Sequence, residues 1–173
     1  MGMAAMSSNT QALRAHCALP ALAPTRGRPP LLNRFVVDGA CCYLLADAGS
    51  RRALVVDPLP ALTDRLAQWL RCQGYALAAV LDTHSHGDHA SSAADLWQAI
   101  SQEPGDVDAL GWPRDADRLS LGGRWLTRLA VPGHTHDSTA YLLHDARGLQ
   151  WAFVGDTVMP GALGRSDFEQ SAP

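Results

Sequence analysis

The densest chemical feature of this sequence is a short histidine cluster that follows an apolar segment. Residues 83–89 read THSHGDH and place His84, His86, Asp88 and His89 within six positions. In an extended loop, residues two apart project to the same side, so His84 and His86 can face one ion while Asp88 and His89 reach a neighbouring point. Imidazole and carboxylate groups are common ligands of zinc and iron. The cluster therefore predicts a metal site.

Two later segments offer further ligands of the same type. His134 lies in the sequence PGHT after the apolar run 126–131, and Asp156 ends the run 151–156. Apolar runs bounded by Gly and Pro predict buried strands. Each of three such runs carries ligand-type residues at its C-terminal end, so we expect them to meet at one rim of a sheet.

Composition removes several classes of function. The chain has 173 residues, the length of one domain, and its net charge of −3 gives no electrostatic footprint for nucleic acid or an anionic membrane. No lysine occurs anywhere in the sequence. This excludes Schiff-base lysine chemistry and the lysine-dependent phosphate loop. Much of the chemistry must then come from a metal.

Cysteine usage and hydropathy bear on the compartment. The four cysteines, Cys17, Cys41, Cys42 and Cys72, show no CxxC spacing, and a disulfide between adjacent residues would be strained. No apolar run approaches the roughly 20 residues needed to span a bilayer. We therefore expect a cytoplasmic protein without a membrane partner.

The N-terminal segment differs in amino-acid composition from the rest of the chain. The first 37 residues contain no acid and four arginines, a composition that could suit an organelle transit peptide. Pro20, Pro24, Pro29 and Pro30 argue against an amphipathic helix through most of it. We therefore favour a disordered leader over residues 1–30.

Ordered structure is expected from Leu31 onward. Helices are predicted from Leu62 to Gly74 and over 90–100, the second starting just beyond His89, where its N-terminus would favour anionic ligands. Strands are predicted over 35–37, 41–46, 53–56, 76–81, 107–110, 119–121, 124–131, 139–143 and 151–154. This succession predicts an α+β sandwich of two sheets flanked by helices. No convincing helix follows residue 101, so the second sheet lacks a cover, and we expect the domain to be cut short at its C-terminus.

The ligand pattern HxHxDH, followed by PGHT and VGDT, resembles the metallo-β-lactamase superfamily from about residue 35 to the end. The resemblance implies an αββα four-layer sandwich over residues 31–173, with the site at one rim of the sheets. Asp57 matches the early aspartate of the superfamily, which buttresses the metal loop.

One branch of the superfamily is the persulfide dioxygenases, also called sulfur dioxygenases. In this branch the positions matching His84, His134 and Asp156 bind a single Fe(2+), the ligand set of a facial triad. The remaining residues of the first cluster would then orient ligands and waters by hydrogen bonds. The implied reaction oxidises glutathione persulfide with O2 to sulfite and glutathione.

The segment 164–169, GRSDFE, resembles the GRTDFQ sequence of that branch. Arg165 is therefore a candidate for binding a carboxylate of glutathione. The alternative is that Arg165 holds the loop through Asp167, and both roles remain open.

The second branch is the glyoxalase II enzymes, which hydrolyse glutathione thioesters at two Zn(2+) or similar ions. There His84, His86 and His134 would bind one metal, Asp88 and His89 the other, and Asp156 would bridge them. That branch also needs a later histidine, and none follows His144. A third alternative is a shortened chain that binds metal without catalysis.

The candidate residues can be grouped by role. We take His84, His86, His134 and Asp156 as metal ligands, Asp88 and His89 as catalytic residues, Arg165 as a substrate contact, and Asp57 and Asp167 as structural supports. The expected partners are a small glutathione-derived substrate and O2, and a homodimer is left open.

Overall fold

The first sheet forms the centre of the fold. The computed structural model of the protein describes residues 31–167 and 169–172, so the predicted leader over residues 1–30 lies outside the described residues. Strands β1 (Leu31–Val37), β2 (Ala40–Asp47), β3 (Arg52–Val56) and β4 (Ala76–Leu81) lie in that order. The first three pair antiparallel, whereas β4 is parallel to β3. Parallel pairing needs a crossover connection, supplied here by the 3-10 helix η1 (Pro60–Leu62) and helix α2 (Thr63–Gln73).

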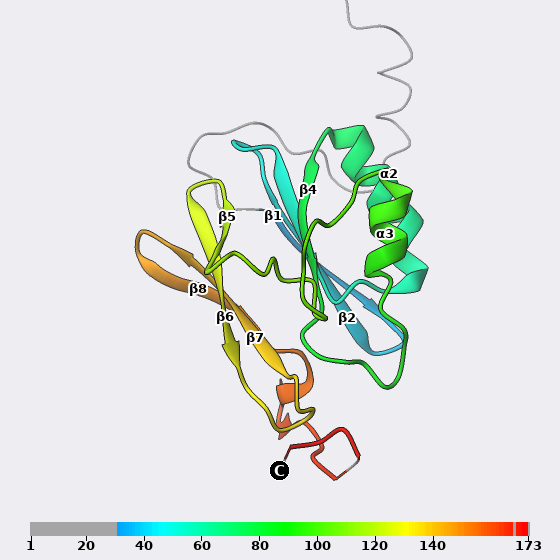
Figure 1. Cartoon of the computed structure of the whole chain (residues 1–173), viewed down its shortest axis with the longest axis vertical. Coiled ribbons are helices and arrows are strands. Elements are labelled where there is room, and N and C mark those ends of the chain that lie inside the picture. The colour runs from blue at the N-terminus through cyan, green and yellow to red at the C-terminus, as the bar shows by residue number, and fades with distance from the viewer. Residues whose placement is uncertain (1–30, 168, 173) are drawn as a thin grey trace, which may run out of the picture.

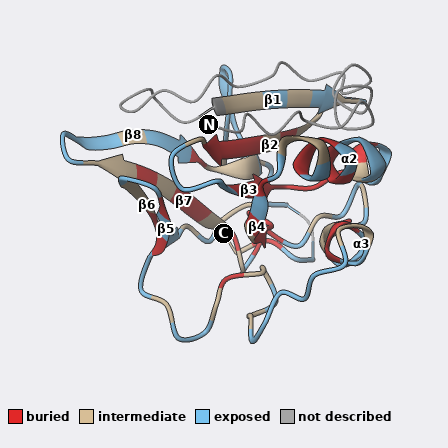
Figure 2. Cartoon of the chain, turned by 90° about the horizontal axis from the view of Figure 1, so that it is seen from above, coloured by how far each residue is buried: buried red, intermediate tan, exposed pale blue. Residues whose placement is uncertain are grey.

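Two helices cover one face of this sheet (Figure 1). The buried stripe of α2 includes Leu66, Trp69 and Leu70, which recur at helical spacing, and Gly74 ends the helix in the left-handed conformation at φ +64°. Helix α3 (Ala93–Ala99) buries Leu96 and Trp97 in the same core cluster. The helices and the sheet therefore enclose a first hydrophobic core, and Figure 2 shows the burial concentrated there.

A second sheet packs against the other face. Strands β5 (Leu119–Leu121), β6 (Arg124–Ala130), β7 (Thr139–Asp145) and β8 (Gly148–Phe153) pair antiparallel in sequence order. Alternate residues of these strands point inward and join residues of the first sheet in a second core cluster, among them Leu45, Leu54, Leu81, Leu126, Tyr141 and Leu143. The described residues thus form three layers in the order helices, sheet, sheet (Figure 1).

The outer face of the second sheet has no helix over it among the described residues. Leu129 and Leu149 are 54% and 55% exposed there. On the same face Trp125 stacks on His144, with ring centroids 5.8 Å apart. The described part of the chain contains no helix with the length and apolarity needed to cross a bilayer.

The predicted strand over 107–110 is wrong. Only an isolated bridge joins Val107 to Pro113, because the Asp108 carboxylate accepts hydrogen bonds from the backbone N–H groups of Leu110 and Trp112 and closes a turn. Gly111 is required in this turn, since a Cβ atom there would lie 2.0 Å from the Val80 carbonyl oxygen.

The predicted start of the second helix is also wrong. Helix α3 begins at Ala93, because the segment before it is held in other ways: Ser92 donates its N–H to the Pro58 carbonyl, and the Ser91 hydroxyl donates to Asp82. Helix α3 therefore does not start directly after His89 as predicted, and its N-terminus gives no support for the expected stabilisation of anionic ligands at the site.

Candidate metal centre

Three loops meet at one end of the two sheets (Figure 1). They are segment 82–92 after β4, segment 131–138 between β6 and β7, and segment 154–172 after β8, which includes the 3-10 helix η2 (Gly155–Thr157) and the short strands β9 (Val158–Met159) and β10 (Ala162–Leu163). Backbone hydrogen bonds tie them together: Thr139 N–H to Thr83 O, His136 N–H to Gln170 O, and Ala172 N–H to Gly133 O. The ligand-type residues of all three loops therefore lie at the same rim.

His84, His134 and Asp156 form one group of potential ligand atoms. One such atom from each residue lies within 4.8 Å of the others. The rings of His84 and His134 have centroids 4.9 Å apart, and His134 Nε2 is 3.6 Å from Asp156 Oδ2. Two imidazoles and one carboxylate are the donor set of a facial triad for Fe(II), so these residues fit a metal of that type.

Hydrogen bonds fix which nitrogen each of the two imidazoles can offer. His134 Nδ1 lies 3.0 Å from the carbonyl oxygen of Arg165, which can only accept, so Nδ1 carries the proton. His84 Nδ1 lies 3.0 Å from Thr83 Oγ1, whose hydroxyl is also within hydrogen-bonding distance of both Asp57 carboxylate oxygens. Thr83 therefore donates to Asp57 and accepts from His84. In both histidines Nε2 is therefore the nitrogen that could bind a metal.

The charge state of His84 favours metal binding. Burial lowers the pKa of His84, and the neighbouring His86 lowers it further, although Asp57 and Asp156 act in the opposite direction. A metal takes imidazole in its neutral form. The site therefore holds His84 in the protonation state that a ligand needs.

His86, Asp88 and His89 form a second group beside the first. Their potential ligand atoms also lie within 4.8 Å of one another. The His86 ring lies between the other two histidines of the cluster, with centroid distances of 4.1 Å to His84 and 4.2 Å to His89. His89 donates from Nδ1 to Asp88 at 2.9 Å, and its Nε2 is buried without a hydrogen-bond partner among the described residues.

Asp57 holds both the first and the second group in place. Its buried carboxylate accepts the backbone N–H of Thr83 at 2.7 Å and lies 3.2 Å from His86 Nε2. Burial alone would lower the pKa of His86, but the hydrogen bond to Asp57 and the charges of Asp57 and Asp82 outweigh it, so the pKa is raised. Because His86 Nε2 is committed to this contact, only its Nδ1 can face a metal.

Asp82 is a buried residue that the sequence reasoning missed. One carboxylate oxygen accepts the Ser91 hydroxyl at 2.7 Å, whereas the other is buried without a hydrogen-bond partner and lies 3.8 Å from His86 Nε2. Burial raises the pKa of Asp82 to about 6. A carboxyl residue ending an apolar strand directly before the ligand cluster was the available signal.

Asp137 is a second missed residue. Its carboxylate accepts the backbone N–H of Ser85 at 3.1 to 3.2 Å, and also the hydroxyls of Ser85 and Thr135. Burial alone would raise the pKa of Asp137, but these hydrogen bonds outweigh it and the pKa is lowered. The acidic residue three positions after the His134 ligand was visible in the sequence, but nothing there indicated its partner.

Two glycines allow the ligand segments to approach closely. A Cβ atom on Gly155 would lie 2.2 Å from Thr83 Oγ1, and one on Gly164 would lie 2.0 Å from the Asp156 carbonyl oxygen and 3.0 Å from His134 Cβ. Both distances are too short for any side chain. The glycines therefore set how closely the third segment can pack against the first two.

Arg165 meets the site through its backbone. Its guanidinium pairs with Asp167 at 2.9 and 3.2 Å, and both side chains are largely exposed. The carbonyl oxygen, by contrast, orients His134 as described above. The structure thus brings Arg165 and Asp167 together but shows no contact of their side chains with the ligand residues.

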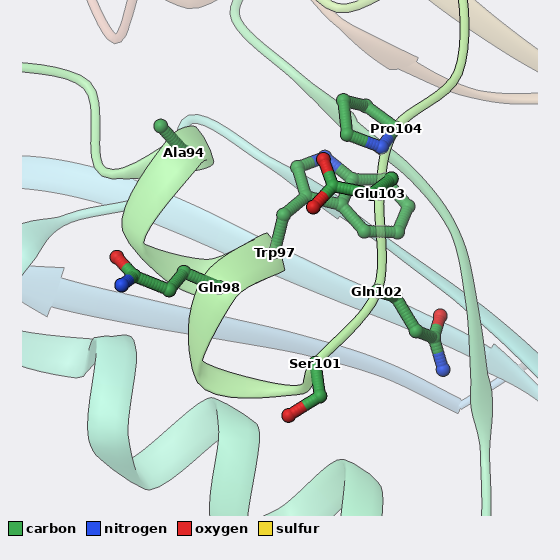
Figure 3. A pocket seen from close by; sticks show the side chains of 7 residues that line it. All are labelled: Ala94, Trp97, Gln98, Ser101, Gln102, Glu103 and Pro104. Carbon is green, nitrogen blue, oxygen red and sulfur yellow. The ribbon is translucent and has the colours of Figure 1, made fainter.

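The hollow seen in Figure 3 lies elsewhere, at the C-terminal end of α3. It has a volume of about 500 Å³ and contains none of the predicted site residues; it is lined by Ala94, Trp97, Gln98, Ser101, Gln102, Glu103 and Pro104. The residues with ligand chemistry are in the three loops, and we place the candidate site there.

Comparison with known proteins agrees with this geometry. Residues 37–105 match the Metallo-beta-lactamase superfamily. Over 152 residues the chain is 31% identical to persulfide dioxygenase ETHE1, mitochondrial, of Bos taurus, and over 139 residues it is 34% identical to a hydroxyacylglutathione hydrolase of Synechococcus sp. (strain CC9902). These alignments cover 83% and 72% of this chain.

A solved structure is similar in fold. The crystal structure of ETHE1 from Myxococcus xanthus superimposes with a TM-score of 0.66 at 27% identity, covering 82% of this chain and 64% of that protein. The chain spans 59% of the bovine protein and 54% of the Synechococcus hydrolase. The described residues thus have the metallo-β-lactamase fold, and residues 37–105 carry the sequence match to that superfamily.

Proposed function

We propose that this chain is an iron-dependent persulfide dioxygenase that oxidises glutathione persulfide with O2 to sulfite and glutathione. The observation that carries the proposal is the division of the ligand residues. His84, His134 and Asp156 form one compact group, whereas His86 falls outside it and into two others, one with Asp88 and His89 and one with Asp57 and Asp82. That division supports a single metal held by two histidines and one aspartate. The similarity to proteins named persulfide dioxygenase supports the reaction.

The three ligand residues would hold Fe(II) through two Nε2 atoms and one carboxylate oxygen. Fe(II) in such a triad supplies open coordination positions where a sulfur atom and O2 can meet. The contribution of the chain is to fix the ligands beforehand. Thr83 and the Arg165 carbonyl hold the Nδ1 protons, so His84 and His134 present unprotonated Nε2 atoms.

The second group would act on water and protons beside the metal. Asp88 is exposed, and its hydrogen bond to His89 lies next to the His86 ring. Burial alone would raise the pKa of Asp88, but backbone and His89 hydrogen bonds lower it. We propose that the ionised Asp88 carboxylate accepts a hydrogen bond from the water that releases sulfite, and that His89 orients Asp88. In this proposal neither Asp88 nor His89 is a metal ligand.

The remaining parts of the proposal concern substrate and setting. Arg165 is proposed to meet a carboxylate of glutathione after exchanging its partner Asp167, a bidentate contact that guanidinium favours. Asp57 is proposed as the structural support of the ligand loop. We also propose a cytoplasmic location, where the thiols of Cys41, Cys42 and Cys72 would stay reduced, and leave assembly as a homodimer open.

A hydroxyacylglutathione hydrolase is the second candidate. Two observations favour it: His86, Asp88 and His89 form a ligand group of their own next to the first, and relatives with that activity match this chain. In that case His86, Asp88 and His89 would hold a second metal, and the two metals would supply an activated water for hydrolysis of the thioester. The two candidates differ in metal content and in the need for O2.

The deciding experiment compares the two reactions in one preparation. The protein is purified anaerobically and loaded with Fe(II), and O2 uptake with glutathione persulfide is followed beside hydrolysis of S-lactoylglutathione. We expect O2 uptake without thioester cleavage. Cleavage of the thioester with no O2 uptake would replace the dioxygenase with the hydrolase.

Two variants of the same chain sharpen this comparison. His134→Ala should abolish O2 uptake, because it removes a triad ligand, whereas His89→Ala should leave much of it. In a dinuclear hydrolase both substitutions would remove a metal ligand. Equal loss of persulfide oxidation in the two variants would count against the single-metal assignment.

A further inference from the structure

We propose that Asp137 is a positioning residue of the metal centre, which acts by clamping Ser85 and so fixing the distance between the His84 loop and the His134 loop. The inference rests on the proposed metal site but not on which reaction that site performs. The Asp137 carboxylate binds Ser85 in the first loop and Thr135 in the second, so its effect would reach the ligands through the residues next to them.

The position of Ser85 makes such a clamp effective. Ser85 stands between His84 and His86, one member of each ligand group. Its backbone N–H points to both oxygens of the Asp137 carboxylate, at 3.2 and 3.1 Å, and its hydroxyl donates to the same carboxylate. A shift of Ser85 would therefore displace the two neighbouring imidazoles.

Asp137 is itself held from its own loop. The Thr135 hydroxyl donates to its carboxylate at 2.7 Å, and the Asp137 carbonyl accepts the Thr139 hydroxyl at 3.0 Å. Thr135 in turn directly follows the ligand His134 and is 2% exposed. The carboxylate is thus fixed relative to His134 before it reaches across to Ser85.

The chemistry of the contact requires a carboxylate. Three donors converge on Asp137: one backbone N–H and two hydroxyls. An ionised carboxylate has only acceptors and can satisfy all three, and hydrogen bonds to a charged acceptor are about twice as strong as neutral ones. In an asparagine the charge is lost and one of the two oxygens becomes an NH2 donor, so the Ser85 N–H keeps a single neutral acceptor and one hydroxyl must turn round to accept. Asp137→Asn should therefore open the clamp with little change in volume.

The test measures cobalt binding to the metal-free protein, since Co(2+) reports ligand geometry without any turnover. The variants are Ser85→Ala, Asp137→Asn and the double substitution. Asp145→Asn is the matched control, because Asp145 also accepts a backbone N–H from a nearby residue but lies in the β7–β8 hairpin. We expect the dissociation constant to rise about tenfold or more for Asp137→Asn, the range for residues that orient ligands, and less for Ser85→Ala.

The double variant separates a clamp from two unrelated effects. If Asp137 acts through Ser85, the double variant should bind Co(2+) no more weakly than Asp137→Asn, and the control should bind like the parent. Dissociation constants within twofold of the parent for both single variants would overturn the proposal, as would effects that multiply in the double variant. Should Asp137→Asn fail to fold, Ser85→Ala decides alone, and unchanged cobalt affinity there refutes the clamp.

A failed clamp and a failed dioxygenase give different results. A chain that cleaves thioesters and takes up no O2 would still show the expected cobalt affinities if the clamp exists. Conversely, if the protein takes up O2 with glutathione persulfide but Asp137→Asn leaves its cobalt affinity unchanged, only the clamp proposal is refuted.

Discussion

Replacing Asp82 by asparagine should change how the stability of the metal-free protein depends on pH. Burial raises the pKa of Asp82 from its ordinary value of 3.8 to about 6. An acid whose pKa is higher in the folded state binds its proton more tightly there. Its stabilising contribution is therefore complete below the unfolded pKa and is lost as the pH rises through about 6.

The size of this effect follows from the shift. A pKa rise of this extent corresponds to a total change of about 3 kcal/mol in the free energy of unfolding. About 2 kcal/mol of this stability is lost between pH 4 and pH 7.5. Asparagine does not ionise, so Asp82→Asn removes the effect. The steric cost of the new amide group is the same at both pH values and cancels in the comparison. We therefore expect the unfolding free energy of the variant minus that of the parent to be about 2 kcal/mol larger at pH 7.5 than at pH 4, so the variant gains relative stability as the pH rises.

The assay is urea unfolding of chelator-treated protein at the two pH values. Asp145→Asn is a control of opposite sign, because hydrogen bonds from Arg147 lower the pKa of the Asp145 carboxyl. In that variant the loss of stability should be larger at pH 7.5 than at pH 4. A difference between Asp82→Asn and the parent that stays the same at both pH values would refute the reasoning from burial.

Three further substitutions test other parts of the structure. Gly164→Ala should prevent metal binding, because its Cβ would clash with the Asp156 carbonyl oxygen of the third segment. Gly133→Ala, whose Cβ meets nothing within 4 Å, should bind metal like the parent, and cobalt titration of both variants tests this. Thr83→Val should weaken metal binding about tenfold or more by removing the acceptor of the His84 proton, and Thr83→Ser should restore it. Ser101→Gly should stabilise the protein by about 1 kcal/mol, because Ser101 has φ +57°, and thermal unfolding measures it. Unchanged stability would show that this conformation carries no strain.

The sequence predicted the elements that have strong periodicity. Helix α2 was visible in the spacing of its apolar residues and in Gly74, and most strands were visible as short apolar runs. The strand predicted at 107–110 failed because the Asp108 side chain bonds to the local backbone, a contact that composition does not reveal. Helix α3 was predicted too early because Ser91 and Ser92 are engaged with β4 and with the segment after β3.

The candidate site also contains some residues that the sequence could reveal and others that it could not. The ligand-type residues could be found from residue type and spacing, since imidazoles at such density have few other uses. The residues that orient them could not, because Asp82 and Asp137 act through partners brought near only by the folded chain. The role of the Arg165 carbonyl is the clearest case. Any residue has a carbonyl group, so no sequence pattern marks the one that orients His134.

The central claim is that His84, His134 and Asp156 hold one ferrous ion. The most direct measurement is anaerobic Fe(II) titration of the metal-free protein with determination of bound iron, in the parent, in Asp156→Ala and in Asp88→Ala. We predict one iron per chain in the parent, loss of that iron in Asp156→Ala, and its retention in Asp88→Ala. Two irons per chain in the parent, with one lost in Asp88→Ala, would contradict it.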